Sequence, residues 1–196
     1  MTVTVDDDEN PSIICPADIS TTTDPGLCYA SGIDLGTPVT SDNCGIADIS
    51  NNGSATYPVG TTTVTWTITD DTGNTNTCTQ LITVEDIEAP TISCPVDLTL
   101  PTDPGVCNAS GVALGTPFTG DNCGIADVSN DGPATFPLGT TTVTWTVIDL
   151  YGNTATCTQE VTIEDQELPT FTPPADVSLS CEEDYTNLTL TGDVFD

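Results

Sequence analysis

The chain repeats itself, and the period of the repeat limits the folds it can adopt. Trp66 recurs as Trp145, a spacing of 79 residues (145 − 66), and four cysteines keep that spacing: Cys15, Cys28, Cys44 and Cys78 return as Cys94, Cys107, Cys123 and Cys157. A period of this size indicates one folded unit per repeat. We therefore expect the tail of a preceding unit with its linker (1–8), two complete units (9–87 and 88–166) and a partial third unit (167–196).

The most regular part of each repeat predicts a β-strand. Val64, Trp66 and Ile68 alternate with threonines, which is the two-residue period of a half-buried strand. Pro-x-Gly precedes this stretch and Asp-x-x-Gly-Asn follows it, and both are turn sequences. Short strands at regular spacing, with no helical periodicity, favour an all-β chain of small β-sandwiches.

The other strands of the first repeat follow from apolar runs and turn residues. A first strand over 12–22 is interrupted by Pro16, so we expect it to lie on an edge or to change sheets there. Further strands are expected over 28–35, 46–50, 54–57, 61–69 and 76–85, with a loop over 37–44. Asn51-Asn52-Gly53 predicts a hairpin between the strands at 46–50 and 54–57.

Composition excludes several classes of function. The chain has no Lys, Arg or His, and its 30 Asp and Glu residues give a net charge of −30. Nothing can neutralise phosphate, so nucleic acid is excluded as a partner, and an anionic membrane surface is disfavoured. No stretch is long and apolar enough to insert into a membrane. With no His or Lys as a base and no cationic side chain for an oxyanion, we expect no enzyme.

The cysteines indicate disulfides and an oxidising compartment. There are nine cysteines, without a Cys-x-x-Cys pair and without a histidine that could complete a zinc site. We expect a secreted or cell-surface protein. The N-terminal residues lack the features of a signal peptide, which favours a mature form or a piece of a longer secreted protein. Cys181, in the partial third unit, has no expected partner in this chain.

Several motifs together resemble the hyalin repeat, or HYR domain. They are Cys-Pro-Ala-Asp, Asp-Asn-Cys-Gly, Tyr/Phe-Pro-x-Gly-Thr-Thr-Thr-Val-Thr-Trp, Asp-x-x-Gly-Asn and Thr-Cys-Thr, and the match covers 11–86 and 90–165. The resemblance implies tandem immunoglobulin-like β-sandwich domains, cell adhesion, an extracellular matrix setting and no catalytic activity. The third copy departs from the pattern, because Pro173 replaces its first cysteine.

Four cysteines in each repeat allow three pairings. In an immunoglobulin-like topology the first and last strands run parallel on neighbouring edges, and simpler members of the family carry only the outer two cysteines. The resemblance therefore implies Cys15–Cys78 and Cys94–Cys157, which leaves Cys28–Cys44 and Cys107–Cys123. The same topology nevertheless places Cys28 towards the opposite end of the domain from the 42–44 loop.

Acidic linkers with the form Asp-x-Glu-x-Pro precede each unit. In extended chain, alternate side chains share a face, so the two carboxylates of a linker would lie together. An immunoglobulin-like sandwich would bring further oxygens from the loop after the second strand and from the final hairpin. The candidate calcium ligands are Asp7, Glu9, Asp42, Asn43 and Asp70; Asp86, Glu88, Asp121, Asn122 and Asp149; and Asp165 and Glu167. The alternative is that these are solvated linkers and ordinary turn residues.

The leading hypothesis is a non-catalytic structural or adhesion segment, a stalk stabilised by disulfides and calcium. Its partners would be neighbouring repeats of the same or an identical chain and an unidentified extracellular ligand or matrix. A second hypothesis is an extracellular filament, in which residues 1–5 complete the open sandwich at 170–196 of another chain by strand addition. A third, a ligand-binding module, needs an exposed aromatic cluster, and the chain has few aromatic residues.

Overall fold

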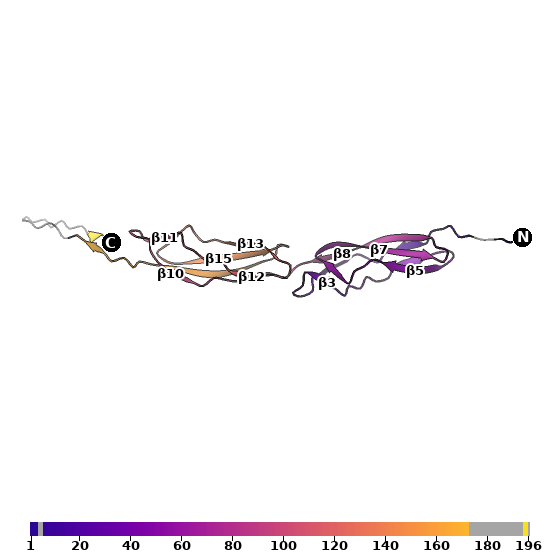
Figure 1. Cartoon of the computed structure of the whole chain (residues 1–196), viewed down its shortest axis with the longest axis horizontal. Coiled ribbons are helices and arrows are strands. Elements are labelled where there is room, and N and C mark those ends of the chain that lie inside the picture. Colours follow the sequence, from indigo (N-terminus) through magenta and orange to yellow (C-terminus); the bar gives the residue numbers. More distant parts are fainter. Residues whose placement is uncertain (4–5, 173–193, 196) are drawn as a thin grey trace, which may run out of the picture. The chain divides into compact units, whose positions relative to one another are not determined.

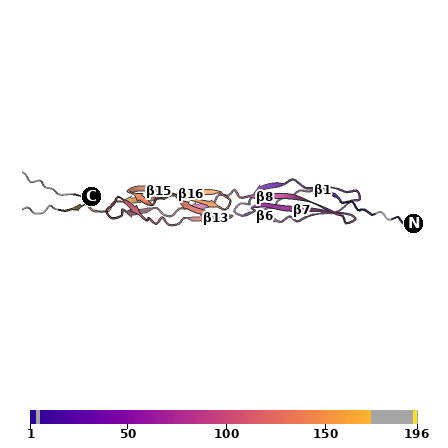
Figure 2. The same ribbon diagram turned by 90° about the horizontal axis from the view of Figure 1, so that it is seen from above.

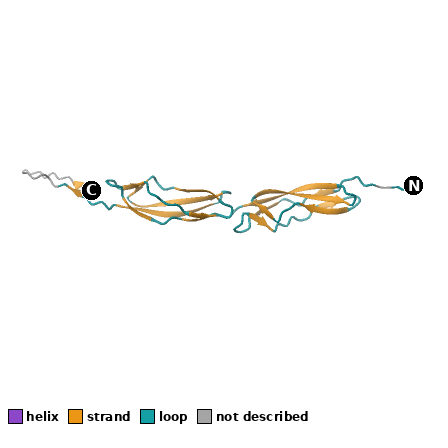
Figure 3. Ribbon diagram, viewed as in Figure 1, coloured by secondary structure: helices purple, strands orange, loops and turns teal. Residues whose placement is uncertain are grey.

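The computed structural model describes residues 1–3, 6–172 and 194–195 (Figure 1). Every regular element in these residues is a β-strand (Figure 3). The chain divides into two compact units, one of Met1–Cys94, Pro117–Asn130 and Trp145–Cys157, the other of Pro95–Thr116, Asp131–Thr144 and Thr158–Asp196. Cys181 and most of the predicted third repeat lie outside the described residues, as do two residues of the predicted N-terminal strand.

The first repeat contains a four-stranded sheet with the order β2-β8-β7-β5. Its strands are β2 (Ile19–Thr22), β5 (Ile46–Asn51), β7 (Gly60–Asp70) and β8 (Thr75–Glu85). β7 and β8 form a long antiparallel hairpin in which Trp66 lies opposite Cys78. β2 runs parallel to β8, with Ile19 opposite Ile82, so the start and the end of the repeat are neighbours.

Two short antiparallel pairs complete the sandwich (Figure 2). β1 (Ser12–Ile14) pairs with β4 (Val39–Ser41), and β3 (Tyr29–Ser31) pairs with β6 (Thr56–Pro58). The predicted strand over 12–22 is therefore two strands in different sheets, and Pro16 lies between them as expected, because proline cannot donate a ladder hydrogen bond. The segment 37–44, predicted as a loop, contains β4.

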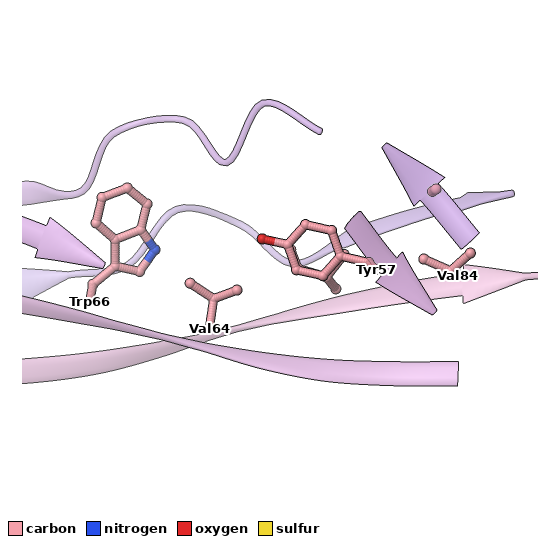
Figure 4. Packing of buried hydrophobic residues seen from close by; sticks show 6 residues of the cluster. Tyr57, Val64, Trp66 and Val84 are labelled. Atoms are coloured by element: carbon pink, nitrogen blue, oxygen red, sulfur yellow. The ribbon is translucent and has the colours of Figure 1, made fainter. Parts of the chain in front are cut away.

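The core lies between the β7–β8 hairpin and the short pairs (Figure 4). The predicted alternation on β7 is confirmed, since its apolar residues are buried and its threonines are not. The cluster consists of Ala30, Tyr57, Val64, Trp66, Ile82 and Val84. A buried glutamine lies beside it: the Trp66 indole N–H donates to Gln80 Oε1 at 3.1 Å, and Gln80 Nε2 donates to the backbone carbonyl of Ala17 at 2.7 Å and of Leu35 at 3.2 Å.

The predicted hairpin around Asn51-Asn52-Gly53 is wrong. β5 pairs with β7, whereas β6 pairs with β3, so the two strands belong to different sheets. The Asn52 side chain accepts a hydrogen bond from the Thr65 N–H at 2.7 Å, which ties this loop to β7. Burial of Tyr57, which is 1% exposed, draws β6 across the core, and this gain outweighs the local turn preference.

The second repeat has the same strand pairs. β9 (Thr91–Ser93) pairs with β12 (Phe118–Gly120), and β13 (Ile125–Asn130) pairs with β15 (Gly139–Asp149). β10 (Leu98–Pro101) runs parallel to β16 (Thr154–Glu164), and β11 (Asn108–Ser110) pairs with β14 (Thr135–Pro137). The sheet order β10-β16-β15-β13 matches that of the first repeat. β17 (Thr170–Phe171) and β18 (Val194–Phe195) form a further antiparallel pair.

Two disulfides are those that the family resemblance implies. Cys15 bonds Cys78 and Cys94 bonds Cys157, with Cα atoms 5.7 and 5.8 Å apart.

The third disulfide corrects the remaining pairings. Cys28 bonds Cys123, and neither Cys28–Cys44 nor Cys107–Cys123 is present; Cys44 and Cys107 are free and exposed. Cys28 and Cys44 cannot bond because they lie near opposite ends of β8. Thr23, near Cys28, donates to the Glu85 carbonyl at the end of that strand, whereas Asp42, near Cys44, lies beside Asp70 at the turn before it. Eleven residues of strand separate the two ends by roughly 30 Å, far beyond disulfide reach.

We predict that Gln80→Leu lowers the free energy of unfolding by about 2 kcal/mol, because the buried indole N–H and two backbone carbonyls lose their partner. Urea denaturation followed by tryptophan fluorescence, at fixed calcium, measures the change. Thr79→Ala, on the exposed side of the same strand, is the matched control. Equal midpoints for the two variants would show that the glutamine is dispensable.

Non-reducing peptide mapping tests the Cys28–Cys123 bond. Trypsin cannot cleave this chain, because it contains no Lys or Arg. A protease that cleaves before Asp releases Cys28 in the peptide 24–33. Cys44 and Cys123 both emerge in the same sequence, Asp-Asn-Cys-Gly-Ile-Ala, so variants must distinguish them. We expect the 24–33 peptide to stay linked in Cys44→Ser and to be released in Cys123→Ser. The reverse result would restore the pairing within the repeat.

Candidate functional site

The candidate site consists of two groups of three aspartates. The first acidic group is Asp7, Asp42 and Asp70, and the second acidic group is Asp86, Asp121 and Asp149. In each group, one carboxylate oxygen of every residue lies within 4.8 Å of the others. Each group draws on the same three places in a repeat: the linker before the first strand, the residue after β4 or β12, and the last residue of β7 or β15.

The turn after β7 binds the linker. Asp70 Oδ1 accepts backbone hydrogen bonds from Thr72 at 2.8 Å, Gly73 at 2.6 Å and Asn74 at 2.8 Å. The Asn74 side-chain amide donates to Asp70 Oδ2 at 2.8 Å and to the backbone carbonyls of Asp7 and Glu9, both at 3.1 Å. This network brings the linker, and with it the Asp7 carboxylate, against the end of β7.

The turn after β15 repeats this arrangement. Asp149 Oδ1 accepts from the backbone N–H groups of Tyr151 and Asn153, both at 2.8 Å. The Asn153 side chain donates to Asp149 Oδ2 at 2.7 Å and to the Asp86 carbonyl at 3.1 Å. Sequence reasoning treated Asn74 and Asn153 only as turn residues. The sequence feature that could have identified them is that each is the last residue of Asp-x-x-Gly-Asn, a motif present in both repeats.

These hydrogen bonds keep the central carboxylates ionised. Burial acts to raise the pKa of Asp70, but hydrogen bonds from Asn74 and Thr72 outweigh it and lower the pKa from 3.8 to about 2. Because the folded pKa is the lower one, the ionised carboxylate contributes stability that is complete above about pH 4 and is lost as the pH falls through about 2. The pKa of Asp149 is lowered too: burial opposes the shift, and hydrogen bonds from Asn153 and Tyr151 drive it.

The second acidic group contains buried oxygens without a partner. Asp121 Oδ1 accepts from the backbone N–H groups of Cys123 at 2.8 Å and Gly124 at 2.9 Å, but Asp121 Oδ2 has no hydrogen-bond partner. Asp86 Oδ1 accepts from Asn122 Nδ2 at 3.2 Å, while Asp86 Oδ2 and Asn122 Oδ1 have none. Asp86 is only 7% exposed and Asp149 only 1%. In the first group, Asp7 Oδ2 is buried and unpartnered in the same way.

A bound cation fits this chemistry. Buried carboxylates are normally paired or coordinated to metal, and this chain has no Lys, Arg or His to pair with them. The donors are carboxylate and amide oxygens, which Ca²⁺ prefers over the nitrogen and sulfur donors that suit zinc. In Asp7, Asp86 and Asp121, Oδ2 has no hydrogen-bond partner and could bind an ion. In Asp70 and Asp149, both carboxylate oxygens accept hydrogen bonds from the turn.

The linker glutamates lie elsewhere. The Glu88 backbone N–H donates to Asp86 Oδ1 at 3.2 Å. Glu88 Oε2 instead accepts from the Gly26 N–H at 2.8 Å, and the Glu167 carboxylate accepts from the Gly105 N–H at 3.0 Å. Glu88 and Glu167 thus bond glycine N–H groups of earlier turns, and their role as calcium ligands stays a prediction.

Three other predicted ligands, Glu9, Asn43 and Asp165, are not members of the two acidic groups. Glu9 and Asn43 are exposed. Asp165 accepts from the Glu167 N–H at 2.9 Å, and the described residues form no third acidic group around it. Asn122 is the amide that the structure brings into a group, through its contact with Asp86. No helix in the described part of the chain is long and apolar enough to cross a membrane.

Comparisons with known proteins agree with the motifs. The HYR domain model matches residues 6–84 and 85–163. Hyalin from Strongylocentrotus purpuratus is 33% identical over 145 residues, covering 70% of this chain and 12% of that protein. Hyalin from Lytechinus variegatus is 34% identical over 149 residues, covering 70% of this chain and 27% of that protein. A third relative comes from Rattus norvegicus and is named Sushi, von Willebrand factor type A, EGF and pentraxin domain-containing protein 1. It is 30% identical over 206 residues, covering 91% of this chain and 6% of that protein.

Among solved structures, Drosophila N-cadherin EC1-4 matches with a TM-score of 0.42 and 12% identity, over 80% of this chain and 50% of that chain. Human protocadherin-24 EC1-2 matches with a TM-score of 0.40 and 14% identity, over 80% of this chain and 99% of that chain. The chain spans only a small part of the hyalins and of the rat protein that it matches. By the two domain matches, and by the cysteine and turn motifs that both copies share, the chain belongs to the HYR domain family, with two tandem domains of the all-β sandwich type.

Proposed function

We propose that these tandem domains form a non-catalytic structural and adhesion segment of a secreted or cell-surface protein, a stalk that calcium makes rigid. The observation that carries the proposal is the set of buried, unpartnered oxygens on Asp86, Asp121 and Asn122 in a chain without a basic side chain. Similarity to hyalin and the disulfides support an extracellular setting. Neighbouring repeats and an extracellular matrix are the proposed partners.

Calcium would act by joining chain segments that otherwise repel each other. The three carboxylates of the second acidic group come from the linker, from the loop after β12 and from the end of β15. At separations below 4.8 Å, their like charges disfavour one another. A divalent ion turns that repulsion into attraction to a common centre. The linker then loses freedom at the point where one domain follows the other, which suits a load-bearing role.

The disulfides would supply resistance to unfolding. A domain of this size buries a modest core, so covalent links matter to its stability. Cys15–Cys78 spans 63 residues, and closing a loop of that length stabilises by roughly 4 kcal/mol in the chain-entropy model. The bond joins the segment between β1 and β2 to β8, so force applied along the chain cannot peel those strands apart.

Isothermal titration of the calcium-free chain tests the proposal. We expect one ion for each acidic group, with dissociation constants on the order of 10⁻⁴ to 10⁻³ M, as in other extracellular modules. At 100 times the dissociation constant, each site adds about 2.7 kcal/mol to the free energy of unfolding. The melting temperature should therefore rise with calcium and fall again with chelator.

Single charge removals assign the sites. Asp121→Asn keeps the oxygen that accepts from Cys123 and Gly124 and removes one ligand oxygen, so it should abolish one binding event. Asp42→Asn should abolish the other. Asp127→Asn, an exposed residue on β13, removes the same charge outside the groups and should retain both. If all three variants bind alike, or sodium reproduces the effect of calcium, the ions merely screen the surface charge.

A further inference from the structure

The turn over 24–28 is held by its own hydrogen bonds. The Leu27 N–H donates to the Asp24 carbonyl at 2.9 Å, and the Asp24 N–H donates to the Tyr29 carbonyl at 2.9 Å. Asp24 Oδ2 accepts from the N–H and the hydroxyl of Ser31, at 3.0 and 2.6 Å. These bonds close the turn without help from other segments, so it is a fixed support for the segments that contact it. The turn and the second acidic group belong to the same compact unit.

The linker that carries Asp86 is attached to this turn. The Gly26 N–H donates to Glu88 Oε2 at 2.8 Å, and the Glu88 N–H donates to Asp86 Oδ1 at 3.2 Å. Asp86 itself is buried. One carboxylate of the second acidic group is therefore only two residues along the chain from a contact with the turn.

The loop that carries Asp121 is attached to the same turn. Cys28 bonds Cys123, with Cα atoms 4.8 Å apart, and the Cys123 N–H donates to Asp121 Oδ1 at 2.8 Å. The Leu27 carbonyl accepts from Asn122 Nδ2 at 3.0 Å. Two adjacent residues of the turn thus hold two adjacent residues of the loop, one pair through a covalent bond and the other through a hydrogen bond.

These contacts orient the Asn122 side chain. Its amide nitrogen lies 3.0 Å from the Leu27 carbonyl oxygen, 3.2 Å from Asp86 Oδ1 and 3.5 Å from the Cys123 sulfur. A carbonyl and a carboxylate can only accept, so the nitrogen faces them and the amide oxygen points elsewhere. That oxygen is buried without a hydrogen-bond partner, as are Asp86 Oδ2 and Asp121 Oδ2. All three oxygens belong to segments that the turn holds.

We propose that the Cys28–Cys123 disulfide makes calcium binding at the second acidic group redox-linked, because the bond positions Asp121 and the Asn122 amide oxygen as ligands. The inference rests on the proposed calcium site. With the bond closed, the loop is ordered before the ion arrives, which favours binding. With the bond open, the ion must order the loop itself. Reduction therefore weakens calcium binding about tenfold, within the usual range for coupled sites.

The coupling acts in both directions. Any factor by which the closed bond strengthens calcium binding is also the factor by which calcium disfavours reduction of that bond. Calcium would thus protect Cys28–Cys123 selectively, whereas a disulfide that does not touch the second acidic group would gain no such protection.

A small thiol such as glutathione supplies the electrons for reduction. Cys28 and Cys123 are both only half-buried, which leaves their bond within its reach. One glutathione thiolate attacks a protein sulfur, forms a mixed disulfide and releases the other cysteine as a thiolate, which takes up a proton. A second glutathione thiolate attacks the mixed disulfide. The protein gains two thiols, and the two glutathiones leave as one oxidised molecule.

A background chain isolates the second acidic group. Asp42→Asn removes a carboxylate of the first acidic group. Cys44→Ser, Cys107→Ser and Cys181→Ser leave six of the nine cysteines (9 − 3 = 6), all of them in the three disulfides. Isothermal titration of this chain should find one calcium site.

Two pairs of substitutions in this background compare the disulfides. Cys28→Ser with Cys123→Ser should raise the calcium dissociation constant about tenfold. Cys15→Ser with Cys78→Ser, the matched control, should leave it unchanged, because Cys78 is eight residues before Asp86 (86 − 78), roughly 26 Å along an extended strand. Thermal melting of each chain verifies that it is folded at the temperature of the titration.

A redox titration keeps the disulfides and so does not depend on how the serine pairs fold. The background chain is equilibrated in glutathione buffers with calcium chloride or with sodium chloride at the same ionic strength, and its thiols are then alkylated. Cleavage before Asp places the cysteines of the two compared bonds in four different peptides: 24–33 and 121–126, and 8–17 and 71–85. Calcium should raise the ratio [GSH]²/[GSSG] at half-reduction of Cys28–Cys123 about tenfold, and should leave that of Cys15–Cys78 unchanged.

The outcomes separate this inference from the calcium proposal. If the background chain binds calcium equally well with and without Cys28–Cys123, or if calcium protects both disulfides equally, the redox linkage is refuted and the calcium site stands. If the background chain binds no calcium at the second acidic group, both are refuted.

Discussion

The structure depends on the absence of any basic side chain. With no Lys, Arg or His, each buried carboxylate must be satisfied by backbone N–H groups, by side-chain amides or by an ion from solution. Asp42 and Asp70 hold their turns through backbone donors, and Asp24 accepts from the Ser31 N–H and hydroxyl. Where these internal donors run out, as at Asp86 Oδ2 and Asp121 Oδ2, buried oxygens remain without a partner, and our proposal places a cation there.

The β7–β8 hairpin contributes both to the core and to the first acidic group. Along β7, Val64, Trp66 and Ile68 are buried on one face, and Asp70 continues their alternation as a buried residue at the strand end. The two-residue period that packs the sandwich thus also places a carboxylate where the linker passes, and Asn74 holds the linker there. Stability of the domain and assembly of the acidic group are consequently coupled, since the hairpin contributes to both.

Much of the fold and part of the site could be predicted from the sequence. The alternation around Trp66, the sheet change at Pro16 and the all-β class rest on local periodicity and on the limits of proline, which act within a few residues. The grouping of Asp86, Asp121 and Asp149 was predicted from the expected topology. The hydrogen bond from the Gly26 N–H to Glu88 was not, because it depends on a turn 62 residues earlier in the chain. The hairpin at Asn52-Gly53 failed because burial of Tyr57 outweighed a local turn preference.

The sequence by itself determined the repeat, the strand class and the acidity, since composition and periodicity do not depend on how the chain is arranged in space. Only the tertiary structure decided which cysteines meet. Cys28 and Cys44 are close along the chain, yet they lie at opposite ends of a long strand pair, whereas Cys28 and Cys123 are 95 residues apart with Cα atoms 4.8 Å from each other. Disulfide pairing follows distance in space, and that distance is set by how the strands stack rather than by their order.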